Sequence, residues 1–241
     1  MANRSGLTYL DDLVASPFAR LTALLDGIGP GALPIDLSLG EPRALIPSYL
    51  GPTLQLHLSE FGRYPPIRGI ASLRQAIAAW LGRRYSALAG HIDADTQVLP
   101  LNGSREGLFS AIFPALARKE FVKRPAVLIP NPFYQAYAAA AAASGAEPVF
   151  LESCAANQFL PTLETIDTEI LQRAIALYLC SPSNPQGAVA DRGYLARAIA
   201  LARRFDFMLF ADECYSEIYG DTPRLGRWKP HLRQVAASPM S

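Results

Sequence analysis

The chain has only three cysteines, and their spacing excludes the usual cysteine-based frameworks. Cys154, Cys180 and Cys214 lie far apart, without a CxxC pair or a Cys/His ligand spacing. The sequence therefore predicts neither a disulfide framework nor a zinc site. We expect the three thiols to be small, buried, hydrophobic groups of a protein in a reducing compartment.

An excess of one charge and long apolar runs are also absent. The 22 basic and 21 acidic residues give a formal net charge of +1, so we expect no nucleic acid partner. The most membrane-like stretch, Ala138–Ala143, is far too short to span a bilayer. The first residues do not resemble a signal peptide, and we expect a cytoplasmic protein with no membrane contact. Half of the residues are hydrophobic and 18% are charged, which permits a large packed core.

Short apolar runs alternate with helical patterns from residue 97 onwards. The runs hardly alternate in polarity, which is typical of strands buried on both faces of a parallel sheet. They are Gln97–Leu101, Ala126–Pro130, Pro148–Leu151, Ala176–Cys180 and Phe207–Ala211. Between them we expect helices at Ser104–Leu116, Tyr134–Ser144 and, after Asp191 as N-cap, Arg192–Phe205. This order predicts a doubly wound α/β fold, which binds ligands at the carboxyl ends of its strands.

The first 95 residues have a different pattern. A Ser-Pro pair predicts a helix from Ser16 to about Leu25, and Ile35–Leu39 can form a short strand. Apolar residues recur at helical spacing over Ile70–Arg84. We expect this stripe to pack in the core; it comprises Ile70, Leu73, Ile77, Trp80 and Leu81.

Two groups that can bind a ligand come after the first two strands along the chain. Gly103 and Ser104 precede a helix whose free N–H groups suit a phosphate, although a simple capped turn has the same sequence. Tyr134 can serve as a stacking platform for a flat ring, or it can be an ordinary core residue.

Two further groups come after the last two strands. Pro182 and Pro185 fix a loop that holds the Asn184 amide, although a tight strand-to-helix connection would look the same. The final strand delivers the carboxylate of Asp212, with Tyr215 three residues on. A buried aspartate needs a cationic partner, such as a protonated ring nitrogen, but Asp212 can also be an N-cap.

In order and spacing these residues resemble the fold-type I aminotransferases of class I/II, which use pyridoxal 5'-phosphate (PLP). The resemblance covers about Ser16 to Asp221 and is carried by Leu37–Pro42, Tyr64–Arg74, Ser181–Val189 and Asp212–Tyr219. The last two strings are most similar to succinyldiaminopimelate aminotransferases. The resemblance implies a three-layer α/β/α large domain with a mostly parallel sheet, incomplete because its last strands and the C-terminal small domain are missing. It divides the chain into an N-terminal arm with part of the small domain (1–45), a partial PLP-binding domain (46–225) and an aberrant tail (226–241).

The resemblance also implies a role for each matching residue. Asp212 would pair with the ring nitrogen, Asn184 and Tyr215 would bind the ring's phenolic oxygen, and Tyr134 would stack on the ring. The phosphate would be bound by Gly103, Ser104 and Arg105. In a homodimer, Tyr64 would reach the phosphate of the neighbouring subunit, and Gly40 would bind the substrate. The implied partners are a small amino acid and a 2-oxo acid.

The lysine to which the family attaches its cofactor has no match here. Lys229 is the only lysine after Asp212, and its neighbours do not form the family's Ser-x-Ser-Lys motif. After Asp221 the chain has no acidic residue, whereas Arg224, Arg227, Lys229 and Arg233 are all basic. Because Gly226–Ser241 can be encoded by codons that resemble the family in another reading frame, we expect a frameshift there.

These observations are compatible with three functions. The first is a PLP-dependent aminotransferase, with glutamate as donor and a 2-oxo acid such as N-succinyl-2-amino-6-oxopimelate of lysine biosynthesis as acceptor. The second is a catalytically inactive fragment that binds PLP weakly at most. The third, a nucleotide-binding module, lacks the G-x-G-x-x-G and P-loop signatures.

Overall fold

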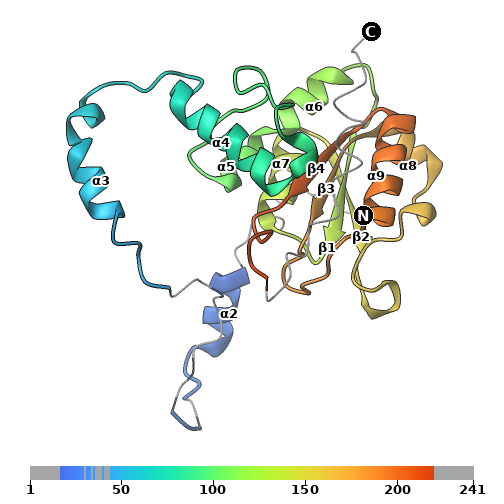
Figure 1. Cartoon of the computed structure of the whole chain (residues 1–241). Helices are drawn as coiled ribbons and strands as arrows, with labels where there is room; N and C mark the ends of the chain where they lie inside the picture. Colours follow the sequence, from blue (N-terminus) through green and yellow to red (C-terminus); the bar gives the residue numbers. More distant parts are fainter. Residues whose placement is uncertain (1–16, 30, 34, 36–39, 41–43, 220–241) are drawn as a thin grey trace. The chain divides into compact units, whose positions relative to one another are not determined.

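The structure is a computed structural model that describes residues 17–29, 31–33, 35, 40 and 44–219. The chain separates into two compact units, one at Ala15–Ile70 and one that begins at Ala71 and includes every strand of the described residues (Figure 1). The predicted division at residues 45–46 concerns the family's domains and stays a prediction.

The unit Ala15–Ile70 contains short helices. α2 spans Pro17–Leu25, α3 spans Leu50–Leu56 and the 3₁₀ helix η1 spans Leu58–Gly62. The predicted helix is confirmed from Pro17 to Leu25. It begins at Pro17 because proline suits the first turn of a helix. Of the strand predicted at Ile35–Leu39 only Ile35 lies within the described residues, and it is outside any strand.

A four-stranded parallel sheet forms the centre of the second unit, in the order β2-β1-β3-β4. The strands are β1 (Ala126–Asn131), β2 (Glu147–Glu152), β3 (Ala174–Cys180) and β4 (Met208–Asp212). β1 and β3, the two central strands, are buried along almost their whole length. Four of the five predicted strands are therefore confirmed, as is the parallel sheet.

Helices cover both faces of the sheet, so the unit has three layers (Figure 1). The described helices of this unit are α4 (Ala71–Arg84), α5 (Ser104–Ser110), α6 (Ile112–Arg118), α7 (Gln135–Ala143), α8 (Thr168–Arg173), α9 (Arg192–Phe205) and the 3₁₀ helices η2 (Ser86–Leu88), η3 (Ala155–Asn157) and η4 (Leu163–Thr165). α9 has the predicted bounds, and the Asp191 carboxylate caps it by accepting from the Tyr194 N–H at 2.7 Å.

Successive residues of the central strands point into two separate cores. In β3, Leu177 and Leu179 pack against α8 and α9, whereas Ala176 and Tyr178 pack against α6 and α7. This alternation is the ordinary period of a strand, and both faces are apolar because both are covered. Among the described residues, no helix is long and apolar enough to cross a membrane.

Two predicted elements differ from the structure. Gln97–Leu101 is not a strand, because it pairs with no edge of the four-stranded sheet and an unpaired strand leaves its N–H and C=O groups unsatisfied. The helix predicted at Ser104–Leu116 is split at Ala111 into α5 and α6. Pro114 explains the break, because it cannot donate to Ser110 and its ring clashes with that carbonyl.

The apolar stripe on α4, predicted to lie in the core, is instead largely exposed. Leu73 is 44% exposed and Trp80 is 40% exposed, whereas Arg74 between them is buried. Arg74 donates to the Asp95 carboxylate at 2.6 Å and to the Ala94 carbonyl at 3.2 Å, which fixes the face that α4 turns inward.

The two outer strands of the sheet differ in how well they are protected. β2 begins and ends with Glu147 and Glu152 and contains Pro148, features that discourage pairing with another chain. β4 reads Met-Leu-Phe-Ala before Asp212, so it carries no charge along the side that pairs with no other described strand. An uncharged apolar edge is a template for association.

We predict that the β4 edge drives self-association of the 241-residue chain. Met208→Lys places a charge on this edge, and we expect smaller particles in size-exclusion chromatography and less light scattering than for the unaltered chain. Phe121→Lys is the control, since Phe121 is 91% exposed but lies outside the strands. Equal improvement by both variants would contradict a specific role for the edge.

Candidate functional site

Asp212 is a buried carboxylate at the carboxyl end of β4. Its residue is 7% exposed and lies opposite Cys180, the last residue of β3. Its Oδ2 accepts from the Tyr137 hydroxyl at 2.6 Å and its Oδ1 accepts from the Cys214 N–H at 3.2 Å. Asp212 thus caps the turn after the strand, rather than a helix, and two donors fix its carboxylate.

Tyr137, on α7, is a site residue that the sequence did not reveal. It is 2% exposed and its ring stacks on that of Tyr178, with centroids 4.3 Å apart and planes 12° apart. Burial, and then the hydrogen bond to Asp212, raise its pKa, so that the hydroxyl remains a neutral donor. The sequence does carry a signal, because Tyr137 is the only large apolar residue in the alanine-rich helix α7.

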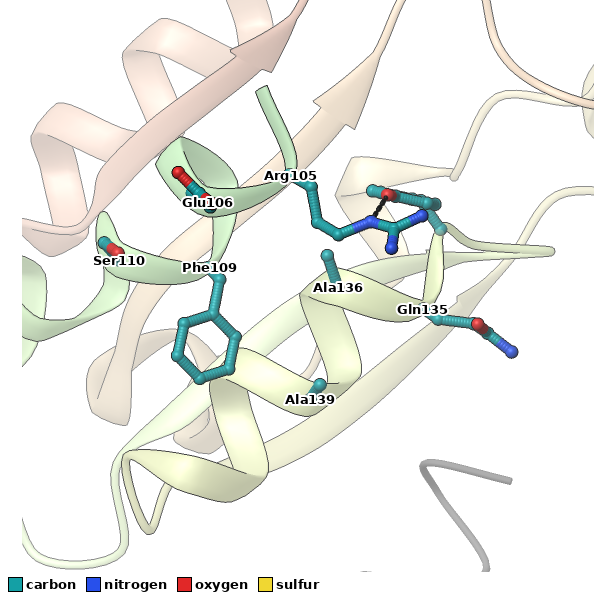
Figure 2. Close-up of a pocket in the computed structure, with 8 residues that line it drawn as sticks. Arg105, Glu106, Phe109, Ser110, Gln135, Ala136 and Ala139 are labelled. Atoms are coloured by element: carbon teal, nitrogen blue, oxygen red, sulfur yellow. Dashed lines mark hydrogen bonds between the residues drawn. The ribbon is translucent and has the colours of Figure 1, made fainter. Parts of the chain in front are cut away.

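Tyr134 and Arg105 form a second part of the site, beside the first. The Arg105 Nε donates to the Tyr134 hydroxyl at 2.5 Å, and the guanidinium carbon lies 5.8 Å from the centre of the ring. Tyr134 in turn meets Tyr137 edge to face, with centroids 5.7 Å apart. α5 and the start of α7 line a cavity of about 340 Å³ here, with Arg105 at one side (Figure 2).

The loop after β3 presents Asn184. The Ser181 and Ser183 hydroxyls accept from the Ala190 and Ala188 N–H groups, each at 3.0 Å, so the loop is the tight connection that the prolines predict. Its Asn184 Nδ2 donates to the Tyr215 hydroxyl at 3.0 Å. Burial raises the pKa of Tyr215, and Asn184 acts against that rise.

The residues predicted at the strand ends therefore converge in part. One chain of contacts joins Arg105, Tyr134, Tyr137 and Asp212, and a second joins Asn184 to Tyr215. Cys180 lies next to both chains, because its sulfur is within 4.8 Å of a carboxylate oxygen of Asp212 and its thiol donates to the carbonyl of Pro182, two residues before Asn184, at 3.2 Å.

Four predicted residues lie outside these contacts. Gly103 is the N-cap of α5, Ser104 is its first residue, and both are exposed. Tyr64, fully exposed, and Gly40 belong to the unit Ala15–Ile70, and their proposed ligands stay predictions.

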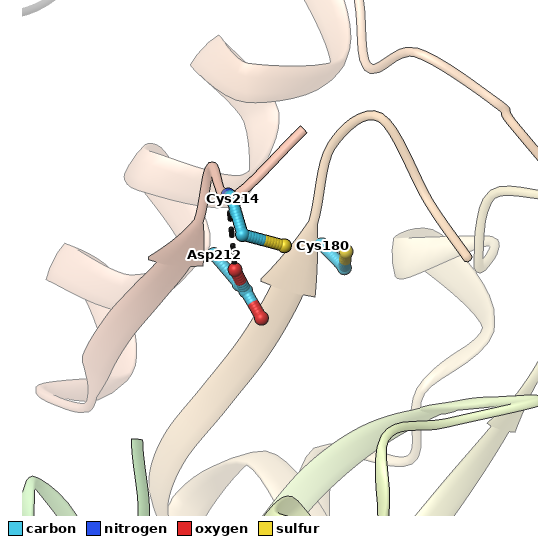
Figure 3. A group of neighbouring side chains, drawn as sticks. All are labelled: Cys180, Asp212 and Cys214. Atoms are coloured by element: carbon cyan, nitrogen blue, oxygen red, sulfur yellow. Dashed lines mark hydrogen bonds between the residues drawn. The ribbon is translucent and has the colours of Figure 1, made fainter. Parts of the chain in front are cut away.

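The cysteines depart from the prediction. Cys214 is exposed, and Cys154 and Cys180 are partly exposed, so none of the three is a fully buried hydrophobe. The ligand atoms of Cys180, Asp212 and Cys214 all lie within 4.8 Å of one another (Figure 3). Burial, and then the Asp212 charge, raise the thiol pKa of Cys180 to about 11 and of Cys214 to about 12. The sequence spacing of these three residues does not predict the group, because the pairing of β3 with β4 brings them together.

The described lysines lie at the opposite end of the strands. Lys119 Nζ donates to the carbonyls of Ala174, the first residue of β3, at 3.0 Å and of Phe205 at 2.8 Å. Burial lowers its pKa. Lys123 lies three residues before the start of β1, and Lys229 lies outside the described residues. The described part of the chain therefore brings no lysine to Asp212.

The side chain of Glu213 anchors the turn between Asp212 and Tyr215 to the core. Its Oε2 accepts from the hydroxyl of Tyr85, a core residue, at 2.5 Å. Burial raises the pKa of Glu213, and Tyr85 and Arg84 act against that rise. Burial therefore favours the protonated carboxyl of Glu213, whereas Tyr85 and Arg84 favour the carboxylate.

The comparisons with known proteins agree with this fold. The sequence matches the family Aminotransferase class I and II over residues 34–235, and the chain belongs to this family. It is a fold-type I member, a class whose cofactor is PLP.

Relatives extend well beyond the chain. It is 33% identical to the LL-diaminopimelate aminotransferase of Moorella thermoacetica over 189 residues, which are 78% of this chain and 46% of that protein. The enzyme of the same name from Desulforudis audaxviator is 31% identical over 92% of this chain and 54% of its own length. A crystal structure of an aminotransferase from Neisseria meningitidis superposes with a TM-score of 0.80 at 39% identity, over 89% of this chain and 54% of that one. The chain thus spans about half the length of the relatives that it matches.

We predict that Glu213 makes the fold less stable as the pH rises. The native state keeps a proton that the unfolded chain has released, so stability is lost as the pH rises from the ordinary carboxyl pKa of 4.5 through the raised native value. Urea unfolding between about pH 4 and pH 7 should show this loss in the unaltered chain and not in Glu213→Gln.

Glu147→Gln provides a control of opposite sign. Arg173 donates to the Glu147 carboxylate at 2.8 Å and holds its pKa below 4.5, so the contribution of Glu147 is lost as the pH falls. Parallel pH profiles for the unaltered chain and Glu213→Gln would contradict the role given to Glu213.

Proposed function

We propose that this chain binds PLP at the carboxyl ends of β3 and β4 and that the site serves amino transfer between an amino acid and a 2-oxo acid. The observation that carries this proposal is the buried Asp212 carboxylate, which two donors fix but which pairs with no basic side chain among the described residues. A protonated ring nitrogen carries the positive charge that a buried carboxylate requires in its partner.

The residues present fit the cofactor. Asp212 would hold the ring nitrogen in its protonated form, while Tyr137 keeps the carboxylate oriented through its hydroxyl. Asn184 and Tyr215, already in contact, would donate to one phenolic oxygen of the ring. When bound, PLP supplies an electron sink for the bonds at the substrate's α-carbon.

The remaining groups of the site suit the ring face and the phosphate. Tyr134 offers its ring for stacking, and its hydrogen bond with Arg105 holds the guanidinium at the same place. Gly103, Ser104 and Arg105 would bind the phosphate, since an arginine fork and backbone N–H groups both match phosphate oxygens. Tyr64 would reach the phosphate of a second subunit in a homodimer, and Gly40 would lie against the substrate carboxylate.

The names of the relatives support a substrate related to diaminopimelate. Those of Moorella thermoacetica and Desulforudis audaxviator are called LL-diaminopimelate aminotransferases. We propose glutamate as the amino donor and a long 2-oxo acid of this kind, such as N-succinyl-2-amino-6-oxopimelate, as the acceptor.

The positions of the described lysines favour a second function, which is PLP binding without turnover. Family chemistry needs an amine at the cofactor, and Lys119 and Lys123 lie at the amino ends of the strands, away from Asp212. The two functions share the binding site and differ in whether amino transfer takes place once PLP is bound.

We predict that Asp212→Asn weakens PLP binding. Loss of a charged hydrogen bond costs about 1.5–3 kcal/mol, which is roughly a 10- to 150-fold increase in Kd. Equilibrium dialysis of the chain against PLP measures this change. Asp206→Asn makes the same replacement at an exposed carboxylate that pairs with Arg118, and it should leave Kd unchanged. If the unaltered chain does not bind PLP, or if both variants bind it equally, the site is misplaced.

We also predict no measurable transamination by the 241-residue chain with glutamate, 2-oxo acids and added PLP. Without a lysine at the site the reaction lacks its proton shuttle, and general acid–base catalysis alone contributes about 10²–10⁴-fold. Measuring formation of 2-oxoglutarate tests this. Turnover would contradict the prediction, and its loss in Lys229→Ala would then show that the tail supplies the amine.

A further inference from the structure

Cys180, Asp212 and Cys214 bring three metal-ligating atoms together from the ends of two paired strands. All three lie within 4.8 Å of one another (Figure 3). A tetrahedral zinc site with bonds of about 2.0–2.3 Å places its ligand atoms roughly 3.3–3.8 Å apart. Small side-chain rotations are therefore enough to close this group around an ion. We propose that these three residues form a binding site for a thiophilic divalent cation, with Zn²⁺ as the test ion.

The ligand types select the kind of cation. Two thiols and one carboxylate favour zinc and similar soft ions over magnesium or calcium, which prefer oxygen alone. Three protein ligands also leave a fourth position for water, as in zinc sites that remain open. Cys214, at the exposed side of the group, gives an ion access from solvent.

Neighbouring groups orient the ligands in the way that metal sites require. The Tyr137 hydroxyl donates to Oδ2 of Asp212 and the Cys214 N–H donates to Oδ1. The Cys180 thiol donates to the Pro182 carbonyl at 3.2 Å, which fixes the direction of its sulfur. Such outer partners fix ligand orientation, and their loss typically costs about 10–100-fold in metal affinity.

The charge of the site is also suited to a cation. Asp212 is 7% exposed, and none of the ion pairs formed by the described residues includes it. A bound cation supplies the positive charge that a buried carboxylate lacks, and it stabilises the deprotonated form of a coordinating thiol.

The cation would share Asp212 with the cofactor. This consequence, unlike zinc binding itself, rests on the proposed function. One carboxylate cannot face a ring nitrogen and a zinc ion in the same place, so zinc and PLP should exclude one another.

The test is zinc binding by the reduced, metal-free 241-residue chain, measured by equilibrium dialysis, with Co²⁺ absorption as a report of thiolate coordination. We expect one equivalent of Zn²⁺ and a thiolate-to-cobalt charge-transfer band. Cys180→Ser and Cys214→Ser should each lose the band and lower zinc affinity by more than about tenfold, and Tyr137→Phe should lower it about 10–100-fold.

Cys154→Ser is the matched control. Cys154 is the N-cap of η3, where serine can replace the thiol as an acceptor, and its sulfur is not part of the group. Zinc affinity should be unchanged, and circular dichroism should show that all variants fold alike. An equal loss of zinc in Cys154→Ser, or no loss in Cys180→Ser and Cys214→Ser, overturns the site. The site is also overturned if mass spectrometry finds a Cys180–Cys214 disulfide that reducing agent does not cleave and that prevents zinc binding.

Competition separates this inference from the proposed function. Zinc should weaken PLP binding in the unaltered chain and not in Cys180→Ser or Cys214→Ser. Zinc binding without any PLP binding would refute the proposed function and leave the metal site intact, whereas PLP binding without zinc binding would refute the metal site alone.

Discussion

The hydrogen bond between Tyr137 and Asp212 is the interaction on which the rest of the site depends. A carboxylate at the end of a buried strand has lost most of its water, and without donors its burial would be costly. The 2.6 Å bond from Tyr137 and the contact from the Cys214 N–H replace that water. Because one donor comes from α7 and the other from the turn after β4, this carboxylate ties a helix, a strand and a loop to one point.

The geometry of α7 makes this bond possible. Alanine at most positions lets the helix lie close to the sheet, so that the single large side chain can cross to the strand ends. Tyr178 of β3 supports the Tyr137 ring by stacking. Tyr134, one turn earlier, meets Tyr137 at its edge and extends the aromatic surface towards Arg105. The order in which these groups touch is therefore set by helical spacing and by the parallel register of the sheet.

The sequence predicted the parts of the fold that depend on local pattern. The runs that became β1 to β4, and α9 with its Asp191 cap, have strong periodicity and clear boundaries. Gln97–Leu101 failed because an apolar run becomes a strand only when a neighbour pairs with it. The break at Ala111 was readable, since Pro114 forbids a continuous helix. Tyr137 and the Cys180–Cys214 proximity were not, because contacts across 75 and 34 residues arise from topology.

The position of Asp212 also explains why PLP and a divalent cation both suit the same site. Both a protonated ring nitrogen and a divalent cation bring positive charge to a carboxylate that no described basic side chain neutralises. They differ in what else they need. A flat ring needs Tyr134 and the Asn184–Tyr215 pair, whereas an ion needs the two thiols and only a few cubic ångströms of space. Tyr134 and the Asn184–Tyr215 pair thus favour the cofactor, and Cys180 and Cys214 favour the metal. Substitutions in either set can therefore separate the two ligands while the carboxylate and its tyrosine donor remain in place.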